Sequence, residues 1–349
     1  MYYRCGRSFD YCHSVAARLN EIAAYAGVSV ATASRVLNGR PGVAEVTRKN
    51  VMTAVDVLGY ERPPSLQPRR LGLIGVVIAE LDNPIFPLFA QAIERALPSF
   101  GYNALLCTRQ LGGPAERATI ELLQEHGVAG IVFVSGRHSD TLADHAHYYE
   151  LRDQGVPLAF INGHIPDLDA TFVATDDLAG MDLAVRHLLE LGHRHIGLAT
   201  GSSRYVPSTR KLAAFRQAMR GHRTDAVTAE HIGDYSIEGG HAAATDLITR
   251  GCTAIVAASD MIALGIIRGV RALNLDVPRD ISVLGCDGSP IMSFTDPPLT
   301  SLKQPVEQLA GAAVRSLIAE IEGTPRPRNE LLFQPELILR GSTGSSHHQ

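Results

Sequence analysis

Residues 18–60, RLNEIAAYAGVSVATASRVLNGRPGVAEVTRKNVMTAVDVLGY, decide the fold of the N-terminal part of the chain. Apolar side chains recur here at helical spacing in three short groups: Leu19, Ile22, Ala23 and Ala26, then Ala33, Val36 and Leu37, then Val51, Ala54, Val55 and Leu58. Gly27 lies in a tight AGVS turn between the first two groups. Three small apolar faces of this kind close on one another, so the stretch predicts a compact three-helix head.

The second of these helices has a polar outer face. Ser29 is a good N-cap, because its hydroxyl can accept a hydrogen bond from an amide two or three residues on, so the helix is predicted to begin at Val30. The face away from the core is short and polar, and a helix of that shape fits the major groove of DNA. Arg35 on this face can form a bidentate pair with guanine, worth about 1–3 kcal/mol of discrimination. The alternative is a solvated or salt-bridged surface arginine.

Charge is distributed unevenly along the chain. Residues 18–71 hold eight basic and four acidic side chains, a net charge of +4, whereas residues 72–349 hold 22 basic and 31 acidic side chains, a net charge of −9. A basic head on an acidic body is typical of a protein that touches phosphate groups with one end only. Chance clustering of charge is the alternative, and the helix pattern of the head argues against it.

The rest of the chain alternates apolar runs with helical segments. The runs occupy residues 71–79, 103–107, 129–135, 157–163, 195–201, 253–259 and 281–287. Continuous apolar runs separated by helices predict parallel sheets that are covered on both faces. Seven such units exceed one modest domain, so we expect two lobes with a ligand crevice between them. In sheets of this kind the ligand binds beyond the carboxyl ends of the strands.

Polar and aromatic side chains gather just past these strand ends. They are Phe86, Phe89, Ser135, Asn162, Tyr235, Ser259, Asp260 and Asp287. Amides and carboxylates pair with sugar hydroxyls and aromatic rings cover apolar sugar faces, so this set favours a carbohydrate ligand. Alternatives stay open: the two phenylalanines can be helix core, Asp260 can cap a helix starting at Met261, and Asp287 can stabilise its own turn.

The head resembles that of the LacI/GalR family of bacterial transcription regulators. The family pattern IAxxAGVSxxTxSRVLNGxxxVxxxTRxxVxxAxxxLGY is matched almost completely over about forty residues, and DPPLTSLKQP at residues 296–305 is similar to the family's crossover between lobes. The resemblance covers roughly residues 18–342. It implies a small all-α helix-turn-helix head plus an α/β body, with two doubly wound parallel-sheet lobes of periplasmic-binding-protein type.

The resemblance assigns DNA contacts in the head. They fall on Ser29, Val30, Ala31, Thr32, Ser34, Arg35, Asn38, Thr47 and Arg48. Val30 and Ala31 would choose the operator sequence, with Arg35 one turn further along. The polar residues of the second helix would hold phosphates or base edges, and the last two residues of the set would meet the DNA backbone.

The linker after the head departs from the family. It reads ERPPSLQPRRLGLIGVV at residues 61–77, without the family's Asn and Ala, and Pro68 falls where a helix would lose a hydrogen bond. In the family a linker leucine wedges into the minor groove and kinks the duplex. Leu66 suits that role better than Leu71, which leaves almost no spacer before the first strand. Arg69 and Arg70 would meet phosphates.

The resemblance also bears on the body. The family's effector-binding arginine falls on Lys211 in RKLAAF, next to Arg210, and lysine cannot pair in the planar bidentate manner of arginine. The family places an aromatic ring at Tyr235 and uses the carboxylate at Asp287 for the ligand. Segments such as NPIFPLFAQAIE and RYVPSTRK are similar to the subgroup that controls maltose or α-glucoside use. The tail lacks leucine heptads, so we expect a homodimer on a pseudo-palindromic operator.

These observations divide the chain into domains. Residues 1–17 are expected to be a disordered extension, residues 18–60 the helix-turn-helix domain, residues 61–71 the hinge and residues 343–349 a tail. Residues 72–342 would form the effector-binding and dimerisation domain. One lobe is placed at about residues 72–175 and 301–323, and the other at about residues 176–300 and 324–342.

Signs of an enzyme are few. The chain has no GxGxxG after the first strand, no P-loop, no GxSxG and no HExxH. The five cysteines are scattered without a CxxC, so neither a zinc site nor a disulfide framework is indicated, and HRH at residues 193–195 is interpreted as surface histidine. We expect no cofactor, no metal and no membrane span, and a cytoplasmic, nucleoid-associated protein with reduced thiols.

The predicted function is a sequence-specific DNA-binding transcriptional regulator. It would repress carbohydrate-utilisation genes, with its operator affinity controlled by a small sugar bound between the two lobes. One alternative is a corepressor-dependent repressor or an activator that responds to a non-sugar metabolite. An alternative of another class is an α/β enzyme or a pure sugar-binding protein.

Overall fold

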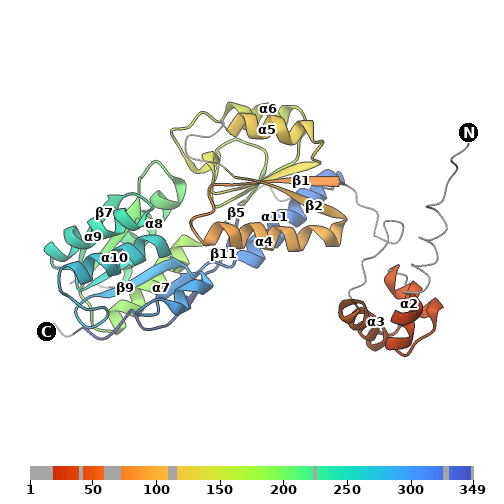
Figure 1. Cartoon of the computed structure of the whole chain (residues 1–349). Helices are drawn as coiled ribbons and strands as arrows, with labels where there is room; N and C mark the ends of the chain where they lie inside the picture. The colour runs from red at the N-terminus through yellow and green to blue at the C-terminus, as the bar shows by residue number, and fades with distance from the viewer. Residues whose placement is uncertain are drawn as a thin grey trace, which may run out of the picture. The chain divides into compact units, whose positions relative to one another are not determined.

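The structure is a computed structural model that describes residues 19–38, 42–58, 72–108, 116–222, 226–324 and 330–346. The chain divides into two compact units, residues 1–71 and residues 72–349, shown in Figure 1. Several predictions lie outside the described residues: the extension at residues 1–17, the hinge at residues 61–71 with Leu66, Arg69 and Arg70, and residues 347–349 of the tail.

The head has the three predicted helical segments. They are residues 19–25, α2 (Val30–Leu37) and α3 (Glu45–Val57). Their apolar faces form one small core of Ile22, Ala23, Ala33, Val36, Leu37, Val51, Ala54 and Val55. Gly27 turns the chain between the first two segments with a φ of 66°, a conformation that glycine adopts without penalty. The prediction was wrong for Leu58, which lies just past the end of α3 and is 42% exposed.

The first lobe of the larger unit is built on a sheet in which every neighbouring pair of strands is parallel. Its strands are β1 (Gly72–Ile78), β2 (Tyr102–Thr108), β3 (Gly130–Val134), β4 (Leu158–Ile161), β5 (Thr171–Thr175) and β11 (Leu331–Phe333). They lie in the order β11-β5-β4-β3-β1-β2. The prediction of buried parallel strands is confirmed, although the apolar runs of the sequence miss β5.

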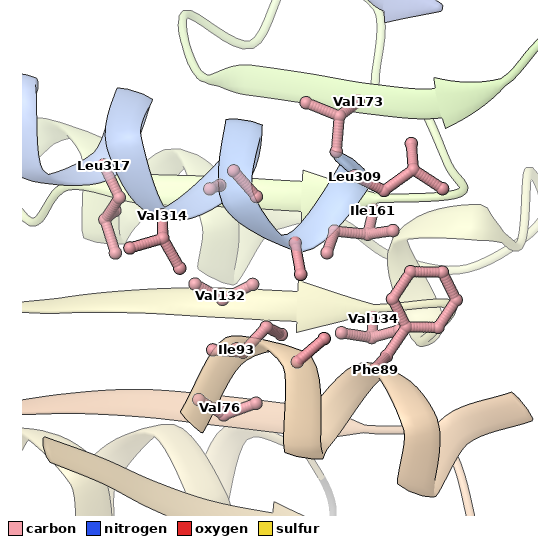
Figure 2. Close-up of a cluster of buried hydrophobic side chains, with 14 of the residues drawn as sticks. Val76, Phe89, Ile93, Val132, Val134, Ile161, Val173, Leu309, Val314 and Leu317 are labelled. Carbon is pink, nitrogen blue, oxygen red and sulfur yellow. The ribbon is translucent and has the colours of Figure 1, made fainter. Parts of the chain in front are cut away.

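Helices cover both faces of this sheet. They are α4 (Ile85–Ala96), α5 (Glu116–Glu125), α6 (Ala146–Asp153) and α11 (Val306–Ile321), with short 3-10 turns η2 (Leu97–Phe100) and η3 (Arg137–Ser139). Figure 2 shows the face under α4 and α11, where Phe89, Val132 and Leu309 are buried together. The next residue of β3, Phe133, points to the opposite face and packs with Tyr148 of α6. This alternation follows from the two-residue period of a strand.

The second lobe repeats the architecture. Its strands are β6 (His195–Gly201), β7 (Val227–Gly233), β8 (Ala254–Ala257), β9 (Ser282–Asp287), β10 (Thr300–Lys303) and β12 (Glu336–Ile338), in the order β12-β10-β9-β8-β6-β7. Only β12 is antiparallel to its neighbour. The helices are α7 (Asp177–Glu190), α8 (Val206–His222), α9 (Ile237–Thr249) and α10 (Asp260–Ala272), with the 3-10 turn η4 (Pro290–Phe294).

Two glycines bring α9 and α10 into close contact. A Cβ atom at Gly240 would lie 2.1 Å from the Ile262 carbonyl oxygen, and one at Gly265 would lie 2.1 Å from the Ile237 carbonyl oxygen. Backbone therefore meets backbone at this crossing, and no larger residue fits. This close contact fixes the position of α10 against α9, and the first residue of α10 lies at the carboxyl edge of the sheet.

The chain crosses between the lobes three times, and two crossings differ from the predicted boundaries. Residues 300–303 pair with β9 of the second lobe as β10, so the crossing falls at Gln304 and not before residue 301. The run LLFQPELILR lies in the segment assigned wholly to the second lobe, but it forms two strands in different lobes. β11 pairs with β5 of the first lobe and β12 with β10 of the second. Pro335 lies between them, where it cannot donate a ladder hydrogen bond.

The described part of the tail is fixed to the second lobe through a buried histidine. His193 is 2% exposed, so its assignment to the surface was wrong, whereas His195 is exposed as predicted. The Nε2 atom of His193 lies 3.0 Å from both the Ser282 hydroxyl and the Gly344 carbonyl oxygen. The Ser346 amide donates to the Leu191 carbonyl at 2.9 Å. Residues 342–346 thus complete the packing of this lobe.

The stability of the first lobe is expected to depend on pH through His138. Burial lowers the pKa of this fully buried imidazole to about 4, although the neighbouring Glu116 carboxylate opposes the shift. The unfolded chain takes up the proton near pH 6.5, whereas the native state takes it up only near pH 4. The free energy of unfolding should therefore fall as the pH is lowered from about 6.5 to about 4, by about 3 kcal/mol for this group.

His138→Phe tests this prediction by urea unfolding over the same pH range. The ring packs against Phe133, Phe160 and Tyr148, so a phenyl group suits the site. We expect the variant to show a shallower loss of stability on the acid side, since one titrating group has been removed. An acid slope equal to that of the unsubstituted chain would contradict the assignment.

Candidate functional site

The outer face of α2 presents the residues singled out in the sequence. Ser29 caps the helix, as predicted, and its hydroxyl accepts a hydrogen bond from the Thr32 amide at 3.1 Å. Val30, Ala31, Arg35 and Asn38 are exposed, and Thr32, Ser34, Thr47 and Arg48 are half-buried. Asn38 ends the helix, and its side-chain amide donates to the Ser34 carbonyl at 2.8 Å. Every described residue of the predicted DNA-contacting set is thus at least partly exposed, either at α2 or near the start of α3.

The larger unit contains a cavity of about 300 Å³ between its two lobes, at the carboxyl ends of strands from both sheets. It is lined by Ala79, Glu80, Asn83, Ile85, Phe86, Phe89, Ser135, Gly136, Ser139, Asn162, Ala174, Asp177, Ser202, Tyr205, Val206, Pro207, Arg210, Lys211, Asp234, Tyr235, Ala258, Ser259, Asp287 and Gln304. A volume of this size is at the lower end of the range for small-molecule sites. Nine of the ten residues predicted to bind a ligand line it.

The tenth residue, Asp260, lies behind the cavity wall. Its side chain is fully buried, and its carboxylate accepts hydrogen bonds from the Ser289 amide at 2.8 Å and the Ser301 hydroxyl at 2.6 Å. It does not cap α10 either, because the helix begins at Asp260 and Ser259 is the cap, accepting from the Ile262 amide at 3.2 Å. Asp260 supports Asp287: its amide donates to that carboxylate at 3.3 Å.

Three of the lining residues have an unusual backbone. Ser135, Asn162 and Asp287, at the ends of β3, β4 and β9, have φ values of 46°, 57° and 130°. Residues other than glycine rarely adopt positive φ, and such conformations concentrate at functional sites. Here the bend turns each side chain from its strand into the space between the lobes.

Gln304 connects the two lobes through its side-chain amide. Its oxygen accepts from the Asn162 amide at 2.9 Å and the Thr175 hydroxyl at 3.1 Å, both in the first lobe. Its nitrogen donates to Asp287 of the second lobe at 2.8 Å. Burial and the neighbouring Asp260 charge raise the pKa of Asp287, whereas the hydrogen bond from Gln304 opposes that shift.

Each of the two described cations that line the cavity is paired with a carboxylate. Arg210 donates through both terminal nitrogens to Glu330, at 2.7 and 2.8 Å. The Lys211 Nζ lies 2.9 Å from an oxygen of Asp177. Burial alone would lower the pKa of Lys211, but the Asp177 charge more than offsets it and raises the pKa above its ordinary value. The ammonium group therefore stays charged.

The aromatic residues take different positions. Phe89 is fully buried among Ile93, Val134 and their neighbours, so it forms core and cavity wall together (Figure 2). Phe86 is only half-buried. Tyr235 lies against the end of β6, where a Cβ atom at Gly201 would lie 2.2 Å from its ring. The Tyr235 oxygen accepts a hydrogen bond from the Ser208 hydroxyl at 3.1 Å.

The lobes also touch beside the cavity. Arg204 of the second lobe forms an ion pair with Asp140 of the first, with its Nε donating at 2.9 Å. The Thr141 amide donates to the Arg204 carbonyl at 2.8 Å, and Tyr205, which lines the cavity, forms an isolated antiparallel bridge with Asp140. Two segments that are about sixty residues apart in the sequence therefore meet at this edge.

Sequence reasoning missed several lining residues. Asp177 follows β5, a strand whose single stretch TFVAT is too short and mixed to stand out. Gln304 stands inside the recognised segment DPPLTSLKQP, but nothing local indicates that its side chain spans two lobes. The position of Asp177, two residues after the end of a strand, is the signal that could have predicted it as a lining residue.

In the part of the chain that the structure describes, no group of three or more histidine, cysteine, aspartate or glutamate side chains is placed to hold a metal ion. No helix in those ranges has the length and apolar composition needed to span a bilayer.

A three-helix head with an exposed groove-sized helix, joined in one chain to a two-lobed body with a polar cavity, defines a helix-turn-helix transcriptional regulator. The head matches the model of bacterial regulatory proteins of the lacI family over residues 18–63. Residues 185–343 match a periplasmic binding protein-like domain. The chain belongs to the LacI family, and it is a regulator and not an enzyme.

Relatives extend over almost the whole chain. The HTH-type transcriptional regulator MalR of Streptomyces coelicolor is 52% identical over 334 residues, which cover 94% of this chain and 97% of MalR. The solved complex of the regulator CelR with cellobiose is 30% identical, with a TM-score of 0.68, covering 93% of this chain and 99% of that one. A lac repressor dimer bound to operator and the anti-inducer ONPF is 26% identical, with a TM-score of 0.69, covering 93% and 98%.

Gln304→Leu should destabilise the larger unit. The substitution leaves the Asp287 carboxylate and the Asn162 amide without their shared partner, which is expected to lower the free energy of unfolding by about 1–3 kcal/mol. Urea unfolding measures the change. Gln308→Leu on the exposed side of α11 is the matched control and should shift stability by no more than about 0.5 kcal/mol. Equal effects of the two substitutions would contradict the bridging role of Gln304.

Proposed function

We propose that this regulator is a repressor of carbohydrate-utilisation genes whose operator affinity is controlled by a small sugar bound between its lobes. The observation that carries the proposal is the composition of the cavity. Asn162 and Gln304 supply amides, Asp287 a carboxylate, and Phe86 and Tyr235 aromatic rings. Amides and carboxylates pair with hydroxyl groups, and rings cover the CH face of a sugar. The cellobiose complex of the related CelR supports the same ligand class.

The proposed ligand contacts are those of the cavity wall. They are Phe86, Phe89, Ser135, Asn162, Arg210, Lys211, Tyr235, Ser259 and Asp287, together with Gln304. A ligand here touches both lobes and the crossing between them, so its binding energy depends on their relative position. Differential affinity of this kind is what links a ligand to a conformational equilibrium.

The proposed DNA contacts lie on α2 and α3. Val30 and Ala31 offer apolar contact, for instance to a thymine methyl group, and Arg35 reads guanine. Thr32, Ser34 and Asn38 hold phosphates or base edges, and Thr47 and Arg48 meet the backbone. A homodimer presents two such heads to the half-sites of a pseudo-palindromic operator, and acts in the cytoplasm at the nucleoid. A solved lac repressor is a dimer on its operator.

Arg35→Ala should markedly weaken operator preference while leaving the fold intact. Arg35 is exposed and is not among the buried residues of α2, so we expect the substitution to affect DNA recognition and not the fold. The loss is expected to be about 1–3 kcal/mol, or roughly 5- to 150-fold in affinity, for a specific site over random DNA. Gel-shift titration measures it, with Arg279→Ala, which removes an exposed arginine of the second lobe, as control. A variant that keeps the full preference for the operator over random DNA would show that Arg35 does not recognise the operator bases.

The ligand is found by thermal-shift screening of the full chain against a sugar panel. At least one sugar should raise the melting temperature, because a ligand that binds only the native state stabilises it. The same sugar should weaken operator binding in gel shifts. A sugar that tightens operator binding would instead identify a corepressor, and no response to any sugar or phosphosugar would overturn the proposed sensor.

A further inference from the structure

The cavity brings together more acidic than basic residues. Among the described lining residues the basic ones are Arg210 and Lys211, and the acidic ones are Glu80, Asp177, Asp234 and Asp287, of which Asp287 has a raised pKa. An anionic ligand entering this space would need cationic side chains whose charge is not already compensated, because a charge leaves water at high cost unless it is paired. The partners of the two cations therefore decide what the cavity accepts.

Arg210 already forms the two parallel hydrogen bonds that recognition of a phosphate would require, but it forms them with Glu330. Its two terminal nitrogens face the two carboxylate oxygens of Glu330, at 2.7 and 2.8 Å. This parallel arrangement occupies the fork through which arginine recognises a phosphate or carboxylate. Only 31% of the Arg210 side chain and 16% of the Glu330 side chain are exposed, so solvent screens the pair only partly.

Lys211 is engaged as closely. Its ammonium group lies 2.9 Å from Asp177, and both side chains are nearly buried. Breaking this pair to serve a ligand would leave the Asp177 carboxylate buried without its counter-charge, which is strongly unfavourable. The lysine therefore holds Asp177 in place and does not act as an anion receptor.

Acidic side chains offset the positive potential at two of the helix ends that meet the cavity, whereas α4 and α8, which also begin there, have no acidic residue in their first turn. The N-terminus of a helix attracts anions through its exposed amides, but acidic side chains occupy the first turn of two helices that begin at the cavity. α7 carries Asp177 there and is capped by Asp176, whose carboxylate accepts from the Ala179 amide at 3.0 Å. α10 carries Asp260 and is capped by Ser259.

From these contacts we infer that the cavity selects uncharged sugars and rejects their phosphorylated and carboxylated forms, with Glu330 and Asp177 setting this selectivity by neutralising Arg210 and Lys211. The inference rests on the proposed sugar-sensing function and specifies its ligand class. Besides these ion pairs, the cavity wall offers neutral donors and acceptors, such as Asn162, and acidic side chains, such as Asp234. Hydroxyl groups can pair with both kinds, whereas a phosphate dianion is repelled by the second.

Isothermal titration of the full chain tests the inference. The probes are glucose, maltose, cellobiose and trehalose, each compared with its 6-phosphate. At least one neutral sugar should bind, and its phosphate should bind more weakly by on the order of tenfold or more. A phosphate that binds as tightly as its neutral parent, or more tightly, overturns the inference while the sensor function stands. If no probe of either kind binds, the proposed function fails and this inference with it.

Glu330→Gln identifies the residue responsible. The variant keeps the shape of the side chain but frees the charge of Arg210, so affinity for the phosphorylated sugar should rise on the order of tenfold and should fall again with added salt. Glu307→Gln, which breaks an exposed ion pair with Arg95 away from the cavity, is the control and should leave both affinities unchanged. Asp177→Asn repeats the test through Lys211 if Glu330→Gln does not fold. If a folded variant binds the phosphorylated sugar no more tightly than the unsubstituted chain does, the ion pair that it breaks does not set the selectivity of the cavity.

Discussion

The hydrogen bonds of one amide connect the two halves of the body. Gln304 stands where the chain passes from β10 of one sheet to α11 against the other, and it joins Asn162 to Asp287 at the carboxyl ends of both sheets. Parallel strands leave their ligand-binding edge at these ends. Because the two edges face each other across a residue that bonds to both, a molecule in the cavity contacts the groups that set the arrangement of the lobes.

The chain separates two kinds of recognition by charge. The head carries a net charge of +4, and its outer helix face offers Arg35 and hydroxyl groups to a polyanion. The body carries a net charge of −9, and the cations of its cavity are paired with carboxylates. DNA binding therefore depends on charge attraction, whereas the cavity depends on hydrogen bonds and ring contacts.

The elements with strong local signals were predictable from the sequence. The cap at Ser29, the core face of α2 and the buried parallel strands follow from residue type and spacing, and the structure confirms them. Nine of ten predicted ligand residues line the cavity, because strand ends are where such sheets bind ligands. Leu58 was predicted to join the core because it continues the apolar spacing of α3, but it lies just past the end of the helix and is exposed.

Contacts between distant segments were not predictable. Glu330 pairs with Arg210 across 120 residues, and no local pattern links them. The division of LLFQPELILR between two sheets depends on which neighbour each half meets. Asp260 looked like a ligand or a cap, but packing of α9 against α10 holds it behind Asp287, where the backbone of Ser289 and the hydroxyl of Ser301 bind it.

We expect the head and the cavity to be thermodynamically linked, so that each ligand changes the affinity for the other. The most direct test uses the sugar found in the thermal-shift screen and measures its dissociation constant by titration, with and without saturating operator DNA. The operator dissociation constant is then measured with and without saturating sugar. Linkage requires both constants to change by the same factor, and coupling of about 1–3 kcal/mol predicts a factor of roughly 5 to 150. A sugar affinity that is identical on free and operator-bound protein would contradict the account.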